Sequence, residues 1–373
     1  MRFTILSENF SKALSIANKA ISPKASLPIL SNVLLETDKG MLKISATDLE
    51  KGIVTWTGAK IHEPGVLSVP AKLLLDFVSN HPAAELECSL EKSSLLLKSN
   101  TVRAKITGMD ASEYPNFSDF KEPAVFVEIN PKEFLKCISQ TSCATSVLDS
   151  RPILTGVLII INSKGITFVG LDGFRLAKKH INLKDAPAEE IRFVIPAKSI
   201  MEAARLFGSM EGLLKISFSK EESLAIFKAQ DTFFTSTVLE GEFPDYEAII
   251  SKENSTTCSV LLEDFSKAIK LSGVFAQDAA KIVKIFLDGD TSKLKVSSQS
   301  EEVGENETDV EAKVQGPSVT VHFNSKYLMD FLNNVDCQEL EFCTNGEFSP
   351  ALLRPKKDSS FIYIAMPVRV TGQ

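Results

Sequence analysis

The residues best placed to do chemistry are two aspartates that stand where an expected strand runs into a turn. Asp48 lies in Ala46-Thr47-Asp48-Leu49-Glu50, and Asp172 holds the equivalent position in Gly170-Leu171-Asp172-Gly173. Together with a neighbouring basic residue, such carboxylates could supply general acid–base catalysis on a nucleotide or a sugar. An aspartate at the end of a strand more often accepts hydrogen bonds from the backbone N–H groups of the turn. The structural role is the favoured interpretation, and an enzyme remains the alternative.

Other reactive groups do not form a recognisable site. The sequence lacks Gly-x-Gly-x-x-Gly, the P-loop pattern and the nucleophile-elbow pattern Gly-x-Ser-x-Gly. Its four histidines are far apart, and the pairs Cys137/Cys143 and Cys337/Cys343 have a six-residue spacing that suits packing better than zinc binding. We therefore expect no catalytic residue, no metal and no cofactor.

The elements that would position these residues recur along the chain with a period of about 125 residues. The clearest anchor is a lysine that enters an expected helix. Val69-Pro70-Ala71-Lys72 returns as Ile195-Pro196-Ala197-Lys198 and, loosely, as Phe323-Asn324-Ser325-Lys326. A second anchor is an aromatic residue in an earlier helix of each block. It is found at Phe10, Phe134 and Phe265. A period this long indicates three domains of one fold.

Each block divides into two halves with the same expected order of one strand, one helix and three strands. Short turns between the strands favour antiparallel neighbours, and each helix has one apolar face that can pack on a sheet. The predicted fold class is therefore α+β, with three tandem domains that each place two helices on antiparallel sheets. The expected domain boundaries are 1–120, 121–252 and 253–373.

The composition is that of an ordinary globular protein of 373 residues, with 44% hydrophobic and 24% charged residues. The apolar runs are of strand length, and the N-terminus is typical of a strand rather than of a signal peptide. The six cysteines are scattered, as expected for reduced thiols. These features indicate a cytoplasmic protein that does not bind a membrane.

The formal net charge of −7 argues against a generally basic nucleic-acid-binding protein, but it allows a locally basic surface. The six expected helices carry ten Lys or Arg and seven Asp or Glu, so the acidic excess lies in the rest of the chain. Lysines that face phosphates without base-reading neighbours would give weak, salt-sensitive and sequence-independent contact. The alternative is that these lysines lie on ordinary solvated helix faces.

Segments along the whole chain carry a family resemblance through their order and spacing. They are Leu27-Pro28-Ile29-Leu30, Ala46–Glu50, Val69–Lys72, Gly170–Ala177, Phe243-Pro244-Asp245-Tyr246 and Tyr363–Val370. With them the chain resembles the bacterial DNA polymerase sliding clamps, the beta subunits of the replicative polymerase III. The resemblance implies a non-catalytic processivity factor. It would be a head-to-tail homodimer, closed into a pseudo-sixfold ring that encircles duplex DNA without sequence preference and slides on it.

The resemblance also implies a hydrophobic cleft between the second and third domains for short linear motifs of the polymerase, the clamp loader and repair proteins. Its expected walls are Leu154, Gly173, Phe174, Arg175, Leu176, Pro244, Ile249, Phe348, Pro350, Ile364, Met366, Pro367, Val368 and Arg369. Apolar walls with a flexible methionine suit the capture of varied peptides. Phe174 replaces the commoner histidine of the family, and Pro350 stands where a small polar residue is frequent. Without the family pattern, Met366-Pro367-Val368 would be interpreted only as a closing strand.

The DNA-facing residues implied by the resemblance are Lys24, Lys72, Arg151 and Lys198. Lys24 lies in the loop before Leu27-Pro28 and matches a family arginine at the duplex. Lys72 and Lys198 lie at equivalent helix starts. Besides the clamp and the enzyme, a third hypothesis is an interaction scaffold that binds peptides but never DNA.

Overall fold

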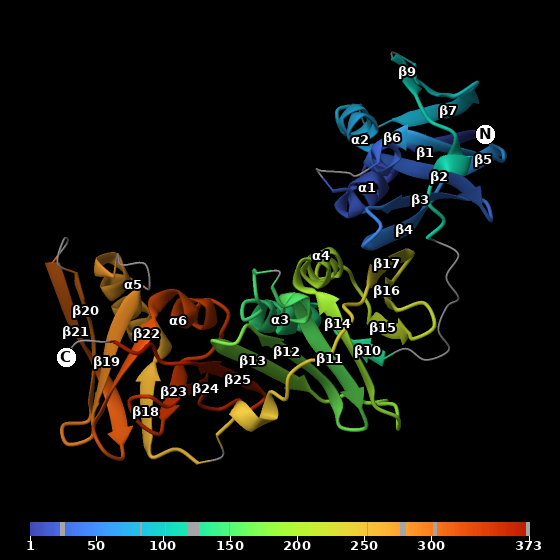
Figure 1. Cartoon of the computed structure of the whole chain (residues 1–373). Helices are drawn as coiled ribbons and strands as arrows, with labels where there is room; N and C mark the ends of the chain where they lie inside the picture. The colour runs from blue at the N-terminus through green and yellow to red at the C-terminus, as the bar shows by residue number, and fades with distance from the viewer. Residues whose placement is uncertain are drawn as a thin grey trace. The chain divides into compact units, whose positions relative to one another are not determined.

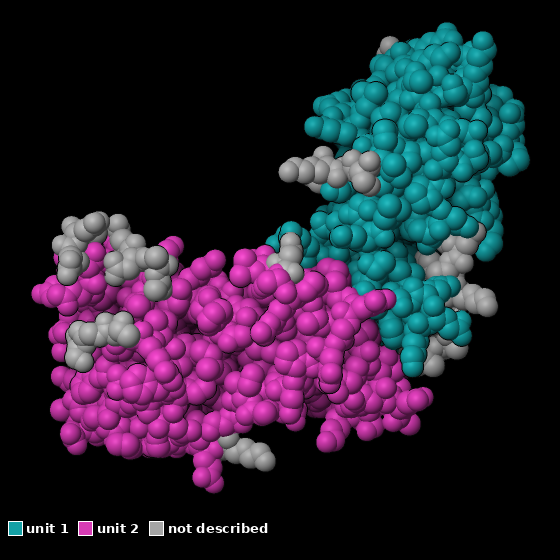
Figure 2. Space-filling view, viewed as in Figure 1, with its two compact units in different colours: residues 1–134, 198–238 teal, residues 135–197, 239–373 magenta. Residues whose placement is uncertain are grey.

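The computed structural model describes residues 1–22, 27–82, 84–100, 102–117, 127–148, 150–251, 253–276, 281–300 and 304–370. The chain forms two compact units, which Figure 2 distinguishes by colour. Unit 1 comprises Met1–Phe134 and Lys198–Val238, and unit 2 comprises Leu135–Ala197 and Leu239–Gln373. The division falls inside the second sequence block. The domain boundaries at 120/121 and 252/253 involve residues outside the described ones, so they stay a prediction.

The order of the elements confirms the repeated pattern of one strand, one helix and three strands (Figure 1). In the first block the elements are β1 (Arg2–Leu6), α1 (Ser7–Ala17), β2 (Asn32–Asp38), β3 (Met41–Thr47), β4 (Lys51–Gly58), β5 (Lys60–Glu63), β6 (Val66–Pro70), α2 (Ala71–Ser79), β7 (Glu85–Glu91), β8 (Ser94–Lys98) and β9 (Arg103–Thr107). The short strand β5 is an addition that the sequence pattern did not predict.

The second block repeats this order without the extra strand. Its elements are β10 (Val127–Ile129), α3 (Pro131–Ser142), β11 (Gly156–Asn162), β12 (Gly165–Leu171), β13 (Arg175–Ile181), β14 (Ile191–Pro196), α4 (Ala197–Phe207), β15 (Leu214–Ser219), β16 (Leu224–Ala229) and β17 (Thr232–Thr237).

The third block does the same and completes a set of six α-helices in the described residues. Its elements are β18 (Thr256–Leu261), α5 (Leu262–Phe275), β19 (Ile282–Asp288), β20 (Lys293–Ser300), β21 (Gly304–Gln315), β22 (Val319–Asn324), α6 (Ser325–Leu332), β23 (Glu339–Thr344), β24 (Ala351–Pro355) and β25 (Phe361–Ala365). Figure 1 shows α5 and α6 side by side over the strands of this block.

Each sheet lies within one unit, and the strand pairs described are antiparallel, as predicted. Unit 1 holds a five-stranded sheet, β5-β1-β7-β8-β9, and an eight-stranded sheet, β10-β15-β16-β17-β4-β3-β2-β6. Unit 2 holds a twelve-stranded sheet, β14-β11-β12-β13-β25-β24-β23-β18-β21-β20-β19-β22. The two larger sheets therefore run from one sequence block into the next.

The pairs that join the blocks follow one rule. In unit 1, β4 of the first block pairs with β17 of the second, with Gly52 opposite Thr235. In unit 2, β13 of the second block pairs with β25 of the third, with Leu176 opposite Ile364. In both pairs, the last strand of a block's first half meets the final strand of the next block. We call these pairs the first and the second junction.

Buried aromatic rings form the cores beneath the helices. The repeated residues Phe10, Phe134 and Phe265 are fully buried, and each packs against another ring. Burying one such side chain stabilises the fold by about 1.5–3 kcal/mol relative to leaving it exposed. The recurring aromatic in the sequence thus identifies the helix face that packs on the sheet.

Gly170 in β12 lets the sheet approach the end of α3 closely. A Cβ atom at this position would lie 2.0 Å from the carbonyl oxygen of Thr141. Because that neighbour is backbone, it cannot swing away as a flexible side chain would. A larger residue at position 170 must therefore push α3 away from the sheet.

We predict that Gly170→Ala lowers the free energy of unfolding of unit 2 by about 1–3 kcal/mol, the usual effect of overpacking a core. Urea unfolding followed by circular dichroism measures it. Gly273→Ala in α5 is the matched control, because its Cβ would meet the nearest atom, Ser325 Oγ, at 3.7 Å. That variant should be neutral or slightly more stable, since alanine favours helix more than glycine does. Equal stability of both variants would contradict the close-approach argument.

Candidate functional site

The turn between β12 and β13 is built around Asp172. One of its carboxylate oxygens accepts hydrogen bonds from the backbone N–H groups of Phe174 at 2.8 Å and Arg175 at 2.9 Å. Gly173 adopts a φ of +91°, which suits a residue without a Cβ. Asp48 makes the same two bonds, to Glu50 at 3.1 Å and Lys51 at 2.9 Å. Both aspartates therefore have the structural role that the sequence favoured.

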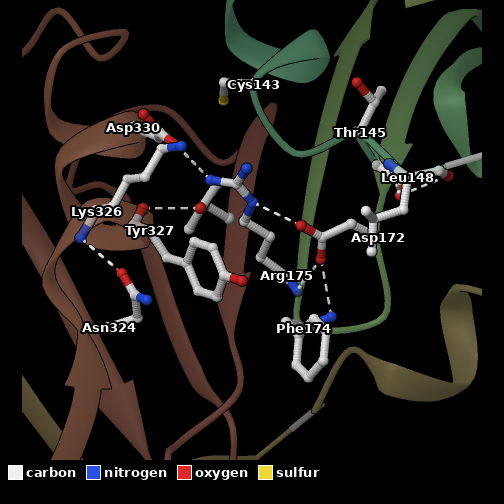
Figure 3. A network of polar contacts seen from close by, with 12 residues as sticks. Cys143, Thr145, Leu148, Asp172, Phe174, Arg175, Asn324, Lys326, Tyr327 and Asp330 are labelled. Atoms are coloured by element: carbon white, nitrogen blue, oxygen red, sulfur yellow. Dashed lines mark hydrogen bonds and ion pairs between the residues drawn. The ribbon is translucent and has the colours of Figure 1, made fainter. Parts of the chain in front are cut away.

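Arg175 links this turn to helix α6. Its Nε donates a hydrogen bond of 2.9 Å to the other oxygen of Asp172, and its Nη1 donates to Asp330 of α6. The guanidinium carbon also lies 4.4 Å from the centre of the Tyr327 ring. Figure 3 shows the guanidinium between the two carboxylates. This planar cation thus fixes the turn relative to the helix.

The side chain of Arg175 is only 8% exposed. Burial opposes its charge, but the carboxylates of Asp330 and Asp172 outweigh that cost and raise the pKa of Arg175. The guanidinium therefore stays charged, and its bonds persist across the usual pH range. Arg175 was expected as a wall of the cleft; in the structure it is buried and links the Asp172 turn to α6.

Exposed apolar side chains lie at this turn and, in the third block, at Phe348 and Met366. Phe174 is 60% exposed, and its ring stacks on that of Tyr327 with centroids 6.4 Å apart. Its carbonyl accepts a 2.8 Å hydrogen bond from the backbone N–H of Met366, which follows β25. The guanidinium carbon of Arg369 lies 5.8 Å from the centre of the exposed Phe348 ring. Exposed aromatic and methionine side chains of this kind are typical of a binding surface rather than of a core.

A buried apolar cluster contains four of the expected cleft residues. Leu154, Leu176 and Ile364 are buried, and Ile249 packs against them together with Phe243 and Ile250. Leu154 comes from the short 3-10 helix Pro152–Thr155, Leu176 from β13 and Ile364 from β25. Segments far apart in the sequence thus meet at the second junction.

The remaining expected cleft residues differ in exposure. Gly173, Pro244, Met366 and Arg369 are exposed, and Pro350, Pro367 and Val368 are half-buried. Val368 donates its backbone N–H to the carbonyl of His322 at 2.8 Å. Pro244 lines a pocket of about 910 Å³, together with Lys178, His180 and Arg192. The function of all fourteen residues stays a prediction.

Sequence reasoning missed Tyr327 and misjudged Asp330. An aspartate in an amphipathic helix is ordinarily expected on the solvent-facing side, but the side chain of Asp330 is only partly exposed because it pairs with Arg175. Tyr327 provides the ring beneath Phe174. The lysine anchor at Lys326 locates the start of α6 in the sequence, but no pattern in the sequence connects that helix with the Asp172 turn.

Three of the expected DNA-facing residues are exposed in the structure. Lys72 and Lys198 each occupy the second position of their helices, α2 and α4, and Arg151 precedes the 3-10 helix at Pro152. Lys24 lies outside the described residues. A groove of about 730 Å³ in unit 1 adds three further basic residues. They are Lys12 of α1, Lys19 of the 3-10 helix Asn18–Ala20 that follows it, and Arg205 of α4. Contact of any of these residues with DNA stays a prediction.

Among the described residues, no group of three or more His, Cys, Asp or Glu is arranged to hold a metal ion. Within the same residues, no helix is both long enough and apolar enough to cross a membrane.

Three family models match consecutive parts of the chain. They describe the N-terminal, central and C-terminal domains of the DNA polymerase III beta subunit, and they match residues 1–118, 128–245 and 247–369. The chain belongs to the DNA polymerase III beta subunit family. The resemblance recognised in the sequence is confirmed, as is the expected fold of three tandem clamp domains. Members of this family are non-catalytic subunits, which removes the enzyme hypothesis.

Relatives from several bacteria match this clamp along its whole length. The beta sliding clamp of Staphylococcus aureus is 29% identical over 380 residues, which cover 99% of each chain. The structure of the Pseudomonas aeruginosa beta subunit superposes with a TM-score of 0.94 at 26% identity, over 99% of this chain and 100% of that one. The Bacillus subtilis sliding clamp also reaches 0.94, at 25% identity and 99% coverage of both chains. A further P. aeruginosa clamp structure, with a TM-score of 0.93 and 26% identity, contains bound griselimycin; the match covers 99% of this chain and 100% of that one.

We predict that Arg175→Met lowers the free energy of unfolding by about 3 kcal/mol, because it leaves two poorly solvated carboxylates without their cation. Adding Asp330→Leu should restore part of the loss, since a buried ion pair replaced by apolar groups often costs little. Lys178→Met is the control. It removes an exposed pair with Glu247 and should cost less than about 1 kcal/mol. Chemical unfolding measures all three, and equal losses for Arg175→Met and Lys178→Met would contradict the supporting role of Arg175.

Proposed function

We propose that this family member works as a dimeric ring in the bacterial cytoplasm. The ring encircles duplex DNA, slides on it without sequence preference and tethers the replicative polymerase, the clamp loader and repair proteins through the cleft at the second junction. One observation carries the proposal: two strand edges in the described residues lack the partner that the junction rule requires.

Among the described strands, the junction rule leaves one strand of the first block and one strand of the third block without the partner that it requires. β21 ends the first half of the third block, so the rule assigns it the final strand of a following block. β9 is the final strand of the first block, and it pairs only with β8 among the described strands. β21 pairs with β20 over residues 304–311, and its other neighbour, β18, pairs with residues 312–315. An exposed strand edge favours pairing with another chain. Pairing β9 of one copy with β21 of another closes a head-to-tail ring.

Charges on the two edges support this pairing. When the three blocks are aligned through their strand pairs, Glu305 of β21 corresponds to Gly52 of β4 and Leu176 of β13. In the same alignment, Lys105 of β9 corresponds to Thr235 of β17 and Ile364 of β25. The junction register then sets Lys105 opposite Glu305. It sets Arg103 opposite Glu307. Opposite charges that face each other across antiparallel strands are stabilising.

Helix α5 provides a second argument for the dimer. Leu271 and Val274 are 53% and 60% exposed, an unusual state for large apolar residues. Counted from the start of the helix, their counterparts in the second block are Gln140 and Cys143. Gln140 is buried and donates to the carbonyl of Asn334 at the end of α6, while Cys143 packs against the core of the third block. A second copy would cover Leu271 and Val274 in the same way, and the hydrophobic effect would favour it.

The DNA contacts in this proposal are weak and electrostatic. Lys72, Lys198 and Lys326 all stand at the second position of a helix and are exposed. A positive charge there opposes the helix dipole, so helix stability does not explain its recurrence in all three blocks. Interaction with phosphates does explain it, and such contact would weaken with salt.

The cleft at the second junction is proposed as the site for client peptides. Its buried floor, exposed aromatic rim and flexible Met366 provide apolar contacts and an adaptable edge. A related clamp from P. aeruginosa binds griselimycin, which supports a ligand site on this fold. Phe174 in place of histidine enlarges the apolar rim, and it should favour aromatic or aliphatic side chains in the clients.

We predict that the protein has a solution mass of two 40.8 kDa chains. After loading by the clamp loader it should remain on a nicked circular plasmid and escape when the plasmid is cut. Gel filtration of the protein–DNA mixture measures retention. Arg103→Glu with Lys105→Glu should weaken the dimer at least about tenfold, because like charges would then face each other. The same variant should lose retention on circles.

Adding Glu305→Lys and Glu307→Lys to this double variant reverses the charges on both sides of the interface. The resulting four-residue variant should again form the dimer and stay on circular DNA. Its failure to do so, with each variant folded, would contradict the register. Equal retention of the wild type on circular and linear DNA would contradict encirclement and favour the scaffold hypothesis.

We predict that deletion of Met366-Pro367-Val368-Arg369 abolishes binding of a peptide from the C-terminus of the replicative polymerase without changing the dimer mass. Phe174→Ala should weaken the same peptide about tenfold, since it removes an exposed aromatic contact. Fluorescence anisotropy measures both affinities. Leu73→Ala changes an exposed apolar residue of α2 in unit 1, whereas the expected cleft residues lie in unit 2, and it serves as the control. Unchanged affinity in the deletion variant would exclude this cleft as the peptide site.

A further inference from the structure

The backbone hydrogen bonds around the turn at the first junction match those at the second junction. In the second, the N–H of Met366 donates to the carbonyl of Phe174 at 2.8 Å; in the first, the N–H of Thr237 donates to the carbonyl of Glu50 at 2.9 Å. The turn hydrogen bonds of Asp48 match those of Asp172. Each residue of the proposed peptide cleft near the turn therefore has a structural counterpart in unit 1.

The ion-pair network is reproduced as well. Lys51 lies 3.4 Å from Asp48 of the turn and 2.5 Å from Glu202, the sixth residue of α4. Arg175 pairs in the same way with Asp172 and with Asp330, the sixth residue of α6. Burial opposes the charge of Lys51, but the two carboxylates raise its pKa, so it stays a cation. Because Lys51 is already neutralised by two carboxylates, it adds no net positive charge to its surroundings.

A pocket of about 310 Å³ opens at the first junction. Its lining includes Glu50, Gly52, Glu222, Leu224, Thr235 and Thr237. Their counterparts at the second junction are Phe174, Leu176, Phe348, Pro350, Ile364 and Met366. Every one of these counterparts is an expected residue of the peptide cleft. The pocket volume is near the lower end of the roughly 300–1,000 Å³ of ligand sites, so it has room for one or two side chains.

The lining of this pocket has a different chemistry. Two aromatic rim residues of the second junction are replaced by Glu50 and Glu222, which are both exposed. Leu224 and Phe117 supply an apolar floor, and Phe117 packs directly over Gly52, where a Cβ would lie 2.4 Å from its ring. The pocket thus combines an apolar floor with an acidic rim.

Leu49 at the mouth of the pocket has no evident structural purpose. Its backbone adopts a φ of +78°, a conformation that disfavours side chains with a Cβ, and its counterpart is Gly173. Its side chain is 52% exposed. A leucine that combines backbone strain with exposed apolar surface does not stabilise the free protein. It does provide an apolar contact for a ligand in the pocket.

We infer that the first junction is a second docking site, which takes a short peptide segment with one apolar side chain flanked by lysine or arginine. The apolar side chain packs against Leu49 and Leu224, and the flanking cations lie beside Glu50 and Glu222. The charge complementarity selects a basic segment, whereas the apolar rim of the second junction selects an uncharged one. The inference rests partly on the proposed peptide function of the second junction, whose architecture it shares.

The test uses the full-length protein with labelled leucine methyl groups, observed by NMR. The probe is the peptide Ac-Lys-Leu-Lys-NH2, and Ac-Glu-Leu-Glu-NH2 is its charge-reversed control. We expect the basic peptide, and not the acidic one, to shift the methyl signals of Leu49 and Leu224 in a saturable way. Glu50→Lys with Glu222→Lys should weaken this binding about tenfold at low salt. Glu189→Lys with Glu221→Lys changes net charge equally outside the pocket lining and should leave the affinity unchanged.

Leu49→Gly gives a second variant that keeps the fold, because glycine suits the positive φ. It should weaken the basic peptide several-fold, as reported by Leu224. Absence of saturable shifts at Leu49 and Leu224, equal binding of both peptides, or an equal loss in the charge control would overturn the inference. Signals of Leu154 and Leu176 report the second junction independently. Failure of the polymerase peptide to shift them would count against the proposed cleft while leaving the first junction as a site.

Discussion

Backbone pairing between consecutive blocks is the constraint on which the sites of this molecule depend. β4 with β17, and β13 with β25, extend sheets across block boundaries through continuous ladders of hydrogen bonds. A ladder fixes register, because a slip by one residue would turn every side chain to the opposite face. The aspartate turn before β4 or β13 is therefore held at a set distance from the helix of the next block. The cation that follows each aspartate can then bridge turn and helix.

The two junctions show how one backbone can carry different chemistry. Arg175 reaches two carboxylates and stacks on Tyr327 because its guanidinium is planar. Lys51 makes the corresponding pairs as a point charge, without such an aromatic partner in the described residues. Around Arg175 the rim is aromatic, and around Lys51 it is acidic. Since the geometry is common, the side chains alone would determine which ligand each of the two proposed sites prefers.

The sequence was sufficient for the repeat, the order of elements, the aspartate turns and the family. These features depend on local patterns, such as a helix start at Lys72 and an aromatic at Phe10, which recur within one block. It was not sufficient for contacts that arise between blocks. Asp330 lies 155 positions after Arg175, and the amphipathic pattern of α6 assigned it to solvent because the pattern contains no information about the neighbouring block. The strand β5 was missed since its four residues alternate too weakly to stand out. The exposure of Leu49 and Leu271 also needed the structure, because a sequence does not distinguish an apolar residue in a core from one on an edge.

The same constraint accounts for the modest charge of the expected DNA-facing residues. In the proposed ring, strand pairing between copies holds the duplex by enclosure, so tight phosphate contacts are unnecessary for retention. They would also be harmful, because each phosphate bond must break when the ring moves along the helix. Exposed lysines at the helix starts would meet this requirement in the proposed ring, because each would contribute a small, salt-screened attraction. Their cost to the helix is about 0.3–1 kcal/mol each, which a fold stabilised by long antiparallel sheets tolerates. Retention and mobility then depend on different parts of the molecule, the strand edges for the first and the helix starts for the second.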